Sequence, residues 1–156
     1  MAKFKTELPN DLIKGVESLE KNSEKMIEDM VLAGAKVAQN RMKQKAPTTI
    51  AKFCAISINY RTPSDGGINR KVYVKEGYLP FSGNRKYFFQ KYSKDYGTMY
   101  VTTLGVPANF LAKLYEYGRS TSPFPKKPFM RRAFKKSEIE AAIKAKEDEY
   151  IKKAGL

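Results

Sequence analysis

The hydrophobic period of this chain changes at Pro47. Before Pro47, apolar residues recur at steps of three and four, which is the spacing of a helix that buries one face. After it, Ile56, Ile58 and Tyr60 alternate with polar residues, which is the spacing of a strand with one buried face. Because each kind of element needs its own period, the chain must combine both. We therefore expect an α+β fold.

Two helices are predicted before Pro47. The first begins at residues 9–11, and the second follows a short polar break and ends at Lys45, before Ala46 and Pro47. Acidic residues at the start of the second helix and basic residues at its end suit the helix dipole. Gly34 lies mid-helix, where glycine costs about 1 kcal/mol relative to alanine, so it predicts a close packing contact.

The middle of the chain predicts a β-hairpin and a third strand. The hairpin strands are residues 56–61 and 71–75, joined by a Pro-Ser-Asp-Gly-Gly turn, and the third strand is residues 99–104. Between them, residues 77–97 are rich in aromatic, Gly and Lys residues and match neither period. We expect a long lid-like or interface loop there.

Two further helices are predicted toward the C-terminus. Residues 108–117 form a short helix that ends at Gly118, and Pro128 opens a final helix that continues to Tyr150. The resulting order predicts long N-terminal helices and a C-terminal helix packed on a small antiparallel sheet. At 156 residues, the chain has the size of a single domain, with residues 77–97 as an inserted loop.

The residue counts exclude several kinds of site. Without His there is no Ser-His or Cys-His pair and no imidazole metal ligand. Cys54, the one cysteine, cannot form an internal disulfide or a Cys-rich zinc site, and we expect a buried thiol. No glycine pair has the Lys-Ser/Thr ending of a phosphate loop. We therefore expect no catalytic, cofactor or metal site.

Hydropathy predicts no association with a membrane. The start of the chain lacks the apolar core of a signal peptide, and the longest apolar run, residues 30–35, is far too short to span a bilayer. The expectation is a soluble protein made in a reducing compartment.

The net charge of +14 is concentrated in one part of the sequence. Residues 46–136 carry seventeen basic and four acidic groups, a net +13. This excess suits a polyanion, an acidic protein surface or water. Lysines outnumber arginines 23 to 7, which favours a diffuse field over base reading. A nucleic-acid-binding module is one interpretation, and solvated lysines beside core or interface aromatics are the other.

The most specific stretch is residues 111–134, LAKLYEYGRSTSPFPKKPFMRRAF. Pro128 fixes the direction of the last helix, and Phe129 with Met130 anchors it. Arg131 and Arg132 lie in its first turn, where the helix dipole disfavours cations. We infer that the two arginines serve an external partner or Glu116.

This stretch resembles the tailed-bacteriophage neck family, also called head–tail joining or tail-completion proteins. The family's segment is aromatic-x-Glu-aromatic-Gly-Thr, a short loop, then Pro-x-Arg/Lys-Pro-Phe-Leu/Met-Arg-x-Ala. The residues that fall on it are Tyr115, Glu116, Tyr117, Gly118, Pro125, Lys127, Pro128, Phe129, Met130, Arg131 and Ala133. Lys45, Ala46 and Pro47 match the family more loosely, and residues 77–97 look like an insertion relative to it.

The resemblance implies a non-enzymatic virion component, made in the host cytoplasm and assembled as a homo-oligomeric, six-fold ring. The ring would sit in the neck between the head-completion or connector protein and the tail terminator. The basic charge would then complement the neighbouring rings, with passing DNA as a secondary contact.

Residues 77–97 and 119–132 are the expected contact regions. The interface candidates are Tyr117, Gly118, Arg119, Pro125, Pro128, Phe129, Arg131, Arg132, Phe88 and Phe89. The alternative is that Phe129, Met130 and Phe134 are simply core residues. A basic nucleic-acid-binding module remains the alternative function, and nothing in the sequence supports an enzyme.

Overall fold

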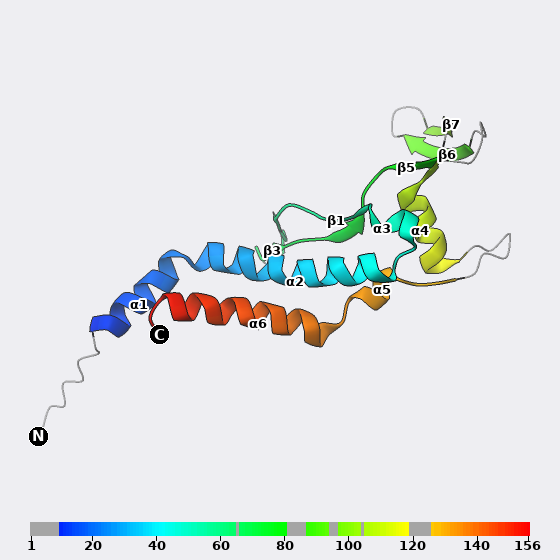
Figure 1. Ribbon diagram of the computed structural model, residues 1–156. Coiled ribbons are helices and arrows are strands. Elements are labelled where there is room, and N and C mark those ends of the chain that lie inside the picture. Colours follow the sequence, from blue (N-terminus) through cyan, green and yellow to red (C-terminus); the bar gives the residue numbers. More distant parts are fainter. Residues whose placement is uncertain (1–9, 65, 81–86, 94–96, 104, 119–125) are drawn as a thin grey trace, which may run out of the picture. The chain divides into compact units, whose positions relative to one another are not determined.

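The computed structural model describes residues 10–64, 66–80, 87–93, 97–103, 105–118 and 126–156 (Figure 1). The chain divides into two compact units, each discontinuous in sequence. The first unit contains Met1–Ala38, Ile56–Lys71 and Lys135–Leu156, and the second contains Gln39–Ala55 and Val72–Phe134. That the whole chain is one domain stays a prediction.

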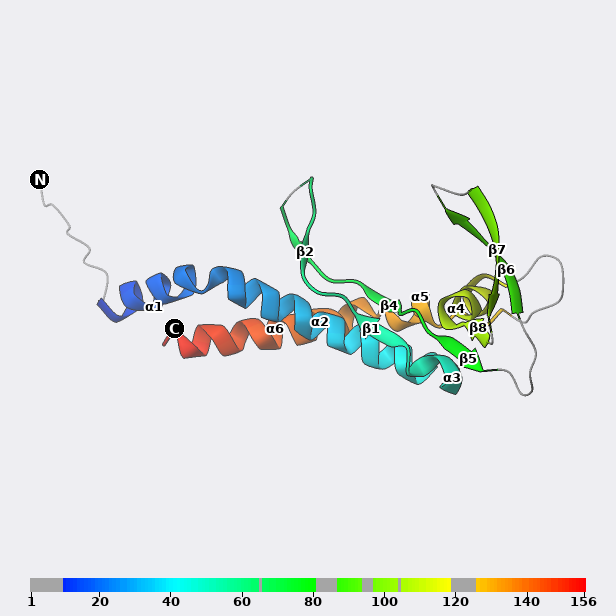
Figure 2. The same ribbon diagram turned by 90° about the horizontal axis from the view of Figure 1, so that it is seen from above.

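The first unit is built mainly from helices. These are α1 (Asn10–Lys21), the N-terminal part of α2 (Ser23–Lys45) and α6 (Lys136–Lys153). Helices α2 and α6 lie side by side in both ribbon views (Figures 1 and 2). A Cβ atom at Gly34 would lie 3.1 Å from Ile139 Cγ2 and 3.2 Å from Ile143 Cγ1. The predicted close contact at Gly34 is therefore confirmed, and its partner is α6.

The predicted hairpin forms, but as two short ladders. Strand β1 (Cys54–Ile56) pairs with β4 (Val72–Val74), and β2 (Tyr60–Arg61) pairs antiparallel with β3 (Ile68–Asn69). The turn between them includes Gly66, with a φ of 66°. The expected buried face is wrong at Tyr60 in β2, which is 39% exposed, and at Ile58, which lies between the ladders and is 85% exposed. Alternation along the sequence did not indicate that the ladder breaks there.

Two strands occupy much of the predicted irregular segment 77–97. Strand β5 (Tyr78–Pro80) pairs antiparallel with β8 (Gly105–Pro107). Strand β6 (Tyr87–Ser93) pairs antiparallel with β7 (Gly97–Thr103), from Tyr87 opposite Thr103 to Ser93 opposite Gly97 (Figure 2). The prediction of a loop without regular structure is wrong for these strands, because backbone pairing forms a ladder without hydrophobic alternation.

The described strands form four separate pairs rather than one small sheet. The α+β class is nevertheless confirmed, with helices at both ends of the described chain and antiparallel pairs between them. Because each pair has only two strands, packing against other elements must supply much of its stability.

The second unit has the buried core. Helix α3 (Thr48–Ala51), helix α4 (Ala108–Tyr117) and the short helix α5 (Met130–Ala133) belong to it. Helix α4 has the predicted bounds and ends at Gly118, whose φ is 80° and whose N–H donates to Leu114 O at 2.8 Å. The core residues come from these helices, from α2 and β1, and from the residue before α5: Met42, Ile50, Cys54, Ala112, Phe129 and Ala133.

The predicted single C-terminal helix is interrupted. Helix α5 begins at Met130, two residues after Pro128, and ends at Ala133. Phe134 and Lys135 then leave the helical conformation, and α6 begins at Lys136. No Pro or Gly marks this break. It coincides with the boundary between the two units, so packing rather than local sequence places it.

Candidate functional site

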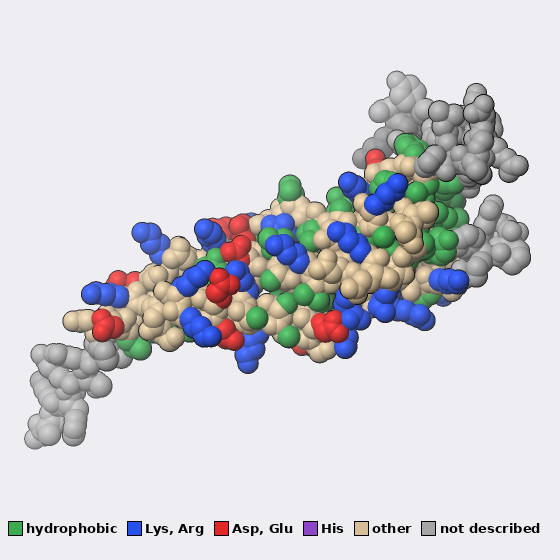
Figure 3. Space-filling model, viewed as in Figure 1, with side chains coloured by type: hydrophobic (Ala, Val, Ile, Leu, Met, Phe, Trp, Pro, Cys, Tyr) green, Lys and Arg blue, Asp and Glu red, His purple; other side chains and the backbone are tan. Residues whose placement is uncertain are grey.

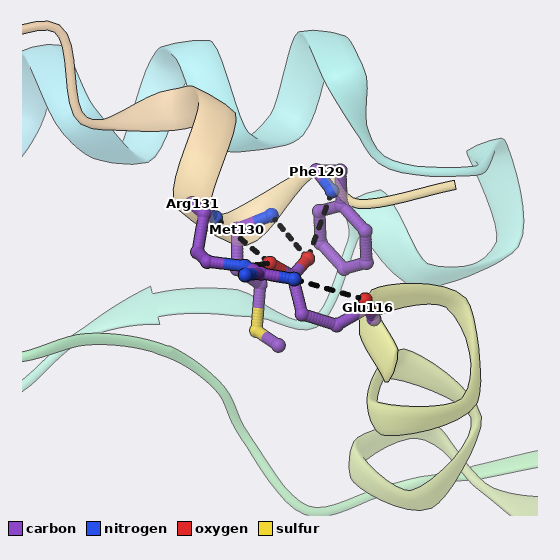
Figure 4. A network of polar contacts seen from close by, with 4 residues as sticks. All are labelled: Glu116, Phe129, Met130 and Arg131. Carbon is purple, nitrogen blue, oxygen red and sulfur yellow. Dashed lines mark hydrogen bonds and ion pairs between the residues drawn. The ribbon is translucent and has the colours of Figure 1, made fainter. Parts of the chain in front are cut away.

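A buried carboxylate joins the two halves of the stretch that the sequence singles out. Glu116 lies near the C-terminal end of α4, and its side chain is 1% exposed. Its Oε2 accepts backbone N–H groups from Phe129 and Met130 at 2.9 and 3.0 Å, and its Oε1 accepts the Arg131 N–H at 3.2 Å (Figure 4). The first N–H groups of a helix have no partner within the helix, so Glu116 satisfies donors that would otherwise be orphaned.

Arg131 completes the same network with its side chain. Its Nε donates to Glu116 Oε1 at 2.8 Å, and its Nη2 donates to Glu116 O at 3.4 Å (Figure 4). The guanidinium is 61% exposed and lies 5.6 Å from the centre of the Tyr117 ring. Of the two partners predicted for Arg131, the structure therefore contains Glu116. We call Glu116, Phe129, Met130 and Arg131 the Glu116 network.

The Glu116 network keeps its carboxylate ionised. Burial by itself raises the pKa of this carboxyl, but the hydrogen bonds from the Arg131 side chain and from three backbone N–H groups outweigh burial. The pKa of Glu116 is therefore lower than that of an ordinary glutamate. A charged acceptor makes stronger hydrogen bonds than a neutral one, so the network holds the end of α4 against the start of α5.

The structure distributes the other interface candidates between core and surface. Phe129 is buried in the core, so its side chain does not face a partner, whereas Phe134 is 53% exposed and is not core. Met130 packs against the core as predicted. Tyr117 is 66% exposed, and Arg132 is also exposed. Gly118 serves as the helix cap and is half-buried.

For four interface candidates the side chain is not placed. Arg119 and Pro125 lie outside the described residues. Phe88 and Phe89 are on β6, opposite Thr102 and Val101 of β7, and only their backbone is described. Their proposed role at an interface stays a prediction.

A basic pocket of about 290 Å³ lies in the second unit. It is lined by Lys45, Lys126, Lys127, Pro128 and Arg132. We call this set the basic pocket. Pro128 and Arg132 were predicted from the sequence as interface residues, but the three lysines were not. Lys45 ends α2, far from the others in the sequence, so no local pattern could bring it to this place.

A second, larger pocket lies in the first unit and is mixed in charge. Its volume is about 370 Å³, and Glu24 and Arg61, which form an ion pair, both line it. Within the residues that the structure describes, no group of three or more His, Cys, Asp or Glu side chains could hold a metal ion. Nothing in this pocket points to a particular ligand.

Cys54 and the helices bear on two simpler expectations. The thiol of Cys54 is buried as predicted, and burial raises its pKa although nearby Lys43 opposes the shift. A buried thiol of raised pKa has little thiolate character and is a poor nucleophile. Among the described residues, no helix is both long enough and apolar enough to cross a bilayer.

The sequence matches no protein-family model, no curated protein and no solved structure. The likeness of residues 111–134 to the neck family stays a prediction made from those residues.

Proposed function

We propose that this chain is a structural component of a tailed-bacteriophage virion, which forms a ring in the neck between the head-closure connector and the tail terminator. The Glu116 network carries this proposal. It joins the aromatic-Glu-aromatic-Gly half of the neck-like segment to the Pro-Phe-Met-Arg half through bonds of 2.8 to 3.2 Å. Four of the residues that carry the resemblance, Glu116, Phe129, Met130 and Arg131, thus form one physical unit, as a shared structural motif requires.

The side chains around this network are divided in a way that suits assembly. Phe129 and Ala133 are buried and hold the backbone in place. Tyr117, Arg131 and Phe134 are exposed on the neighbouring turns. Because Tyr, Phe and Arg are enriched at the centres of protein interfaces, this exposed set is the surface that we assign to a neighbouring subunit or ring.

The proposal assigns the chain no catalytic role. The protein would be made in the host cytoplasm, form a homo-oligomeric ring of about six copies, and be incorporated into the virion neck. Its partners would be the head-completion or connector protein on one side and the tail terminator on the other. The absence of His from the whole sequence agrees with a role in assembly rather than acid–base chemistry.

A basic nucleic-acid-binding module is the second candidate, and one observation favours it. The second unit contains most of the excess positive charge, with fifteen basic and three acidic residues. A monomer with this charge would bind nucleic acid without any ring.

The oligomeric state of the purified full chain separates the two candidates. We expect native mass spectrometry and sedimentation velocity to detect a closed ring whose population rises with protein concentration, and we expect the protein to join isolated heads to tails. A protein that stays monomeric at every concentration and does not join heads to tails would overturn the neck proposal. Salt-sensitive DNA binding by that monomer would favour the second candidate.

A further inference from the structure

The positive charge of this protein is segregated by structural unit. The second unit carries fifteen basic and three acidic residues, a net +12, whereas the first unit carries fifteen and thirteen, a net +2. On the face drawn in Figure 3, acidic and basic side chains are interspersed over α1, α2 and α6 of the first unit. The field around the second unit therefore has little local compensation.

The acidic residues of the second unit offset its positive charge even less than their number suggests. Glu116 is buried, and its charge is paired with that of Arg131, so it does not pair with the cations of the basic pocket. Among the described residues of this unit, Glu76 is then the one exposed carboxylate. It does not line the basic pocket.

The basic pocket concentrates this uncompensated charge. Four of its five lining residues are cations, and in the described part of the chain none of the four forms an ion pair. Two of these cations sit on backbone positions that neighbouring contacts hold. The Lys127 N–H donates to Tyr115 O at 2.9 Å, and Arg132 lies between Arg131, held by Glu116, and the buried Ala133.

We propose that the basic pocket binds phosphate groups of a nucleic-acid backbone. The lining chemistry favours phosphate over an acidic protein surface. The centre of a protein interface is apolar and depleted in lysine, whereas protein–DNA interfaces are strongly positive. Its lining, as far as the structure describes it, has three lysines and one arginine around a single proline, and no aromatic residue.

The same lining predicts that nucleic acids bind to the pocket independently of their base sequence. Lysine ammonium groups act as point charges, without the rigid fork by which arginine reads a guanine edge. Among the described residues, no aromatic side chain on which a base could stack lines the pocket. We therefore expect duplexes of different sequence to bind alike, with an affinity that falls steeply as salt rises.

The test compares two variants of the full chain that lose the same charge from the same unit. Lys127→Gln with Arg132→Gln removes two cations of the basic pocket, and Lys75→Gln with Lys113→Gln removes two exposed cations that do not line it. Binding to a short random-sequence DNA duplex is measured by fluorescence anisotropy from roughly 50 to 200 mM salt. Circular dichroism and thermal unfolding establish that both variants fold.

We expect the pocket variant to bind roughly tenfold more weakly than the control variant. We also expect the slope of log K against log salt to become shallower by about 0.9 for each phosphate that the variant no longer neutralises. Equal binding by the two variants would overturn the proposal and leave only the general field of the unit. A polyglutamate peptide that binds more tightly than DNA, and in a pocket-dependent way, would overturn it in favour of an acidic protein partner.

This inference does not depend on ring formation. Sedimentation of the pocket variant reports assembly separately from DNA binding. If the protein forms a ring that does not bind DNA, the proposal of a phosphate site is wrong and the neck proposal stands. If it stays monomeric and binds DNA through the basic pocket, the neck proposal is wrong and the phosphate site stands.

Discussion

Glu116 is the one charged residue that is fully buried among the described residues. Its carboxylate is removed from water and receives four donors, one from the Arg131 side chain and three from the backbone at Phe129, Met130 and Arg131. Removing this acceptor leaves the three backbone donors without a partner, whereas the exposed Arg131 side chain can still bind water. An unsatisfied buried donor costs more than the net gain of the bond. Local stability around residues 116 and 129–131 should therefore depend on this one side chain.

Glu116→Gln is expected to lower the free energy of unfolding by about 2–4 kcal/mol. The amide keeps the shape of the carboxyl but loses its charge, and it turns an NH₂ group toward donors. Urea denaturation measures the effect. Glu140→Gln is the matched control, because Glu140 forms only an exposed ion pair with Lys136 at 3.5 Å. We expect that control to change stability by less than about 0.5 kcal/mol, and equal losses in the two variants would contradict the role of Glu116.

The lowered pKa of Glu116 also predicts how stability depends on pH. The pKa of Glu116 in the folded state lies below the unfolded value of about 4.3. The network therefore contributes its full share of the unfolding free energy above the unfolded pKa, and this contribution is lost as pH falls through the folded pKa. The difference in unfolding free energy between wild type and Glu116→Gln should therefore be constant near neutral pH and shrink below about pH 4.

Taking that difference removes a competing effect. Hydrogen bonds from Lys146 and Lys153 lower the pKa of Glu149 to about 2, but both proteins contain Glu149, so its contribution cancels. A difference that stays constant down to pH 3, or grows as pH falls, would contradict the ionised Glu116 network.

Among the elements, α2 and α6 make a contact that depends on a single small residue, Gly34. The hypothetical Cβ at Gly34 approaches Ile139 and Ile143 to within 3.3 Å, closer than most real Cβ contacts. A glycine in a helix is justified when a neighbouring helix comes this near, since the lost helix propensity is offset by close packing. At the other end of the unit, the Tyr150 hydroxyl donates to Asp29 Oδ2 at 2.6 Å and joins the same two helices.

Gly34→Leu is expected to lower the free energy of unfolding by about 1–3 kcal/mol, because the new side chain has no space between α2 and α6. Thermal or urea denaturation measures the loss. Lys36→Leu introduces the same residue at an exposed position of α2 and should be nearly neutral. Adding Ile143→Ala to Gly34→Leu should restore part of the loss. A Gly34→Leu protein as stable as wild type would contradict the close contact.

The elements differ in how well their sequences predicted them. Residues 108–117 were predicted as a helix with its glycine cap, and α4 has those bounds. Strands β5 and β6 were not predicted, because residues 78–80 pair with residues 105–107, and the aromatic run at 87–89 has no alternation. A strand is stabilised by its partner, so a single segment has less information about a strand than about a helix.

At the scale of the whole molecule, the two units differ in charge and in their exposed apolar residues. The first unit is nearly neutral, and it also exposes apolar side chains, of which Ile58 is the most exposed among the described residues. The second unit is strongly basic and exposes Tyr117 and Phe134 beside the Glu116 network. We therefore assign assembly contacts to the second unit.

Tyr117→Ala combined with Phe134→Ser is expected to raise the dissociation constant of the ring by roughly tenfold or more, since truncating an interface hot spot costs about 2 kcal/mol. Sedimentation velocity across a concentration series measures it. Ile58→Ala with Tyr60→Ala removes exposed apolar side chains from the first unit and serves as the control. These exposed substitutions should leave thermal unfolding nearly unchanged. If both pairs weaken assembly equally, the second unit is not the specific interface.

Replacing Arg131 together with Arg132 would be a poorer test of assembly. Arg131 pairs with the buried Glu116, so its loss would alter the fold as well as any interface. The two arginines are equivalent in the sequence pattern, but only Arg132 lines the basic pocket and only Arg131 belongs to the Glu116 network.

Five features could be predicted from local sequence: the α+β class, the bounds of α4, the C-terminal end of α2 at Lys45, the turn glycine at residue 66 and the close contact at Gly34. These features follow from hydrophobic period, caps and turn residues, which act within a few residues of one another. Two other features became visible only in the folded chain. Glu116 accepts hydrogen bonds from the backbone N–H groups of residues 129–131, and Lys45 lines the same pocket as Lys126, Lys127 and Arg132. The tertiary structure also decided that the last helix breaks at Phe134 and Lys135. Such features depend on where distant segments are brought together, and burial and charge act there through space rather than along the chain.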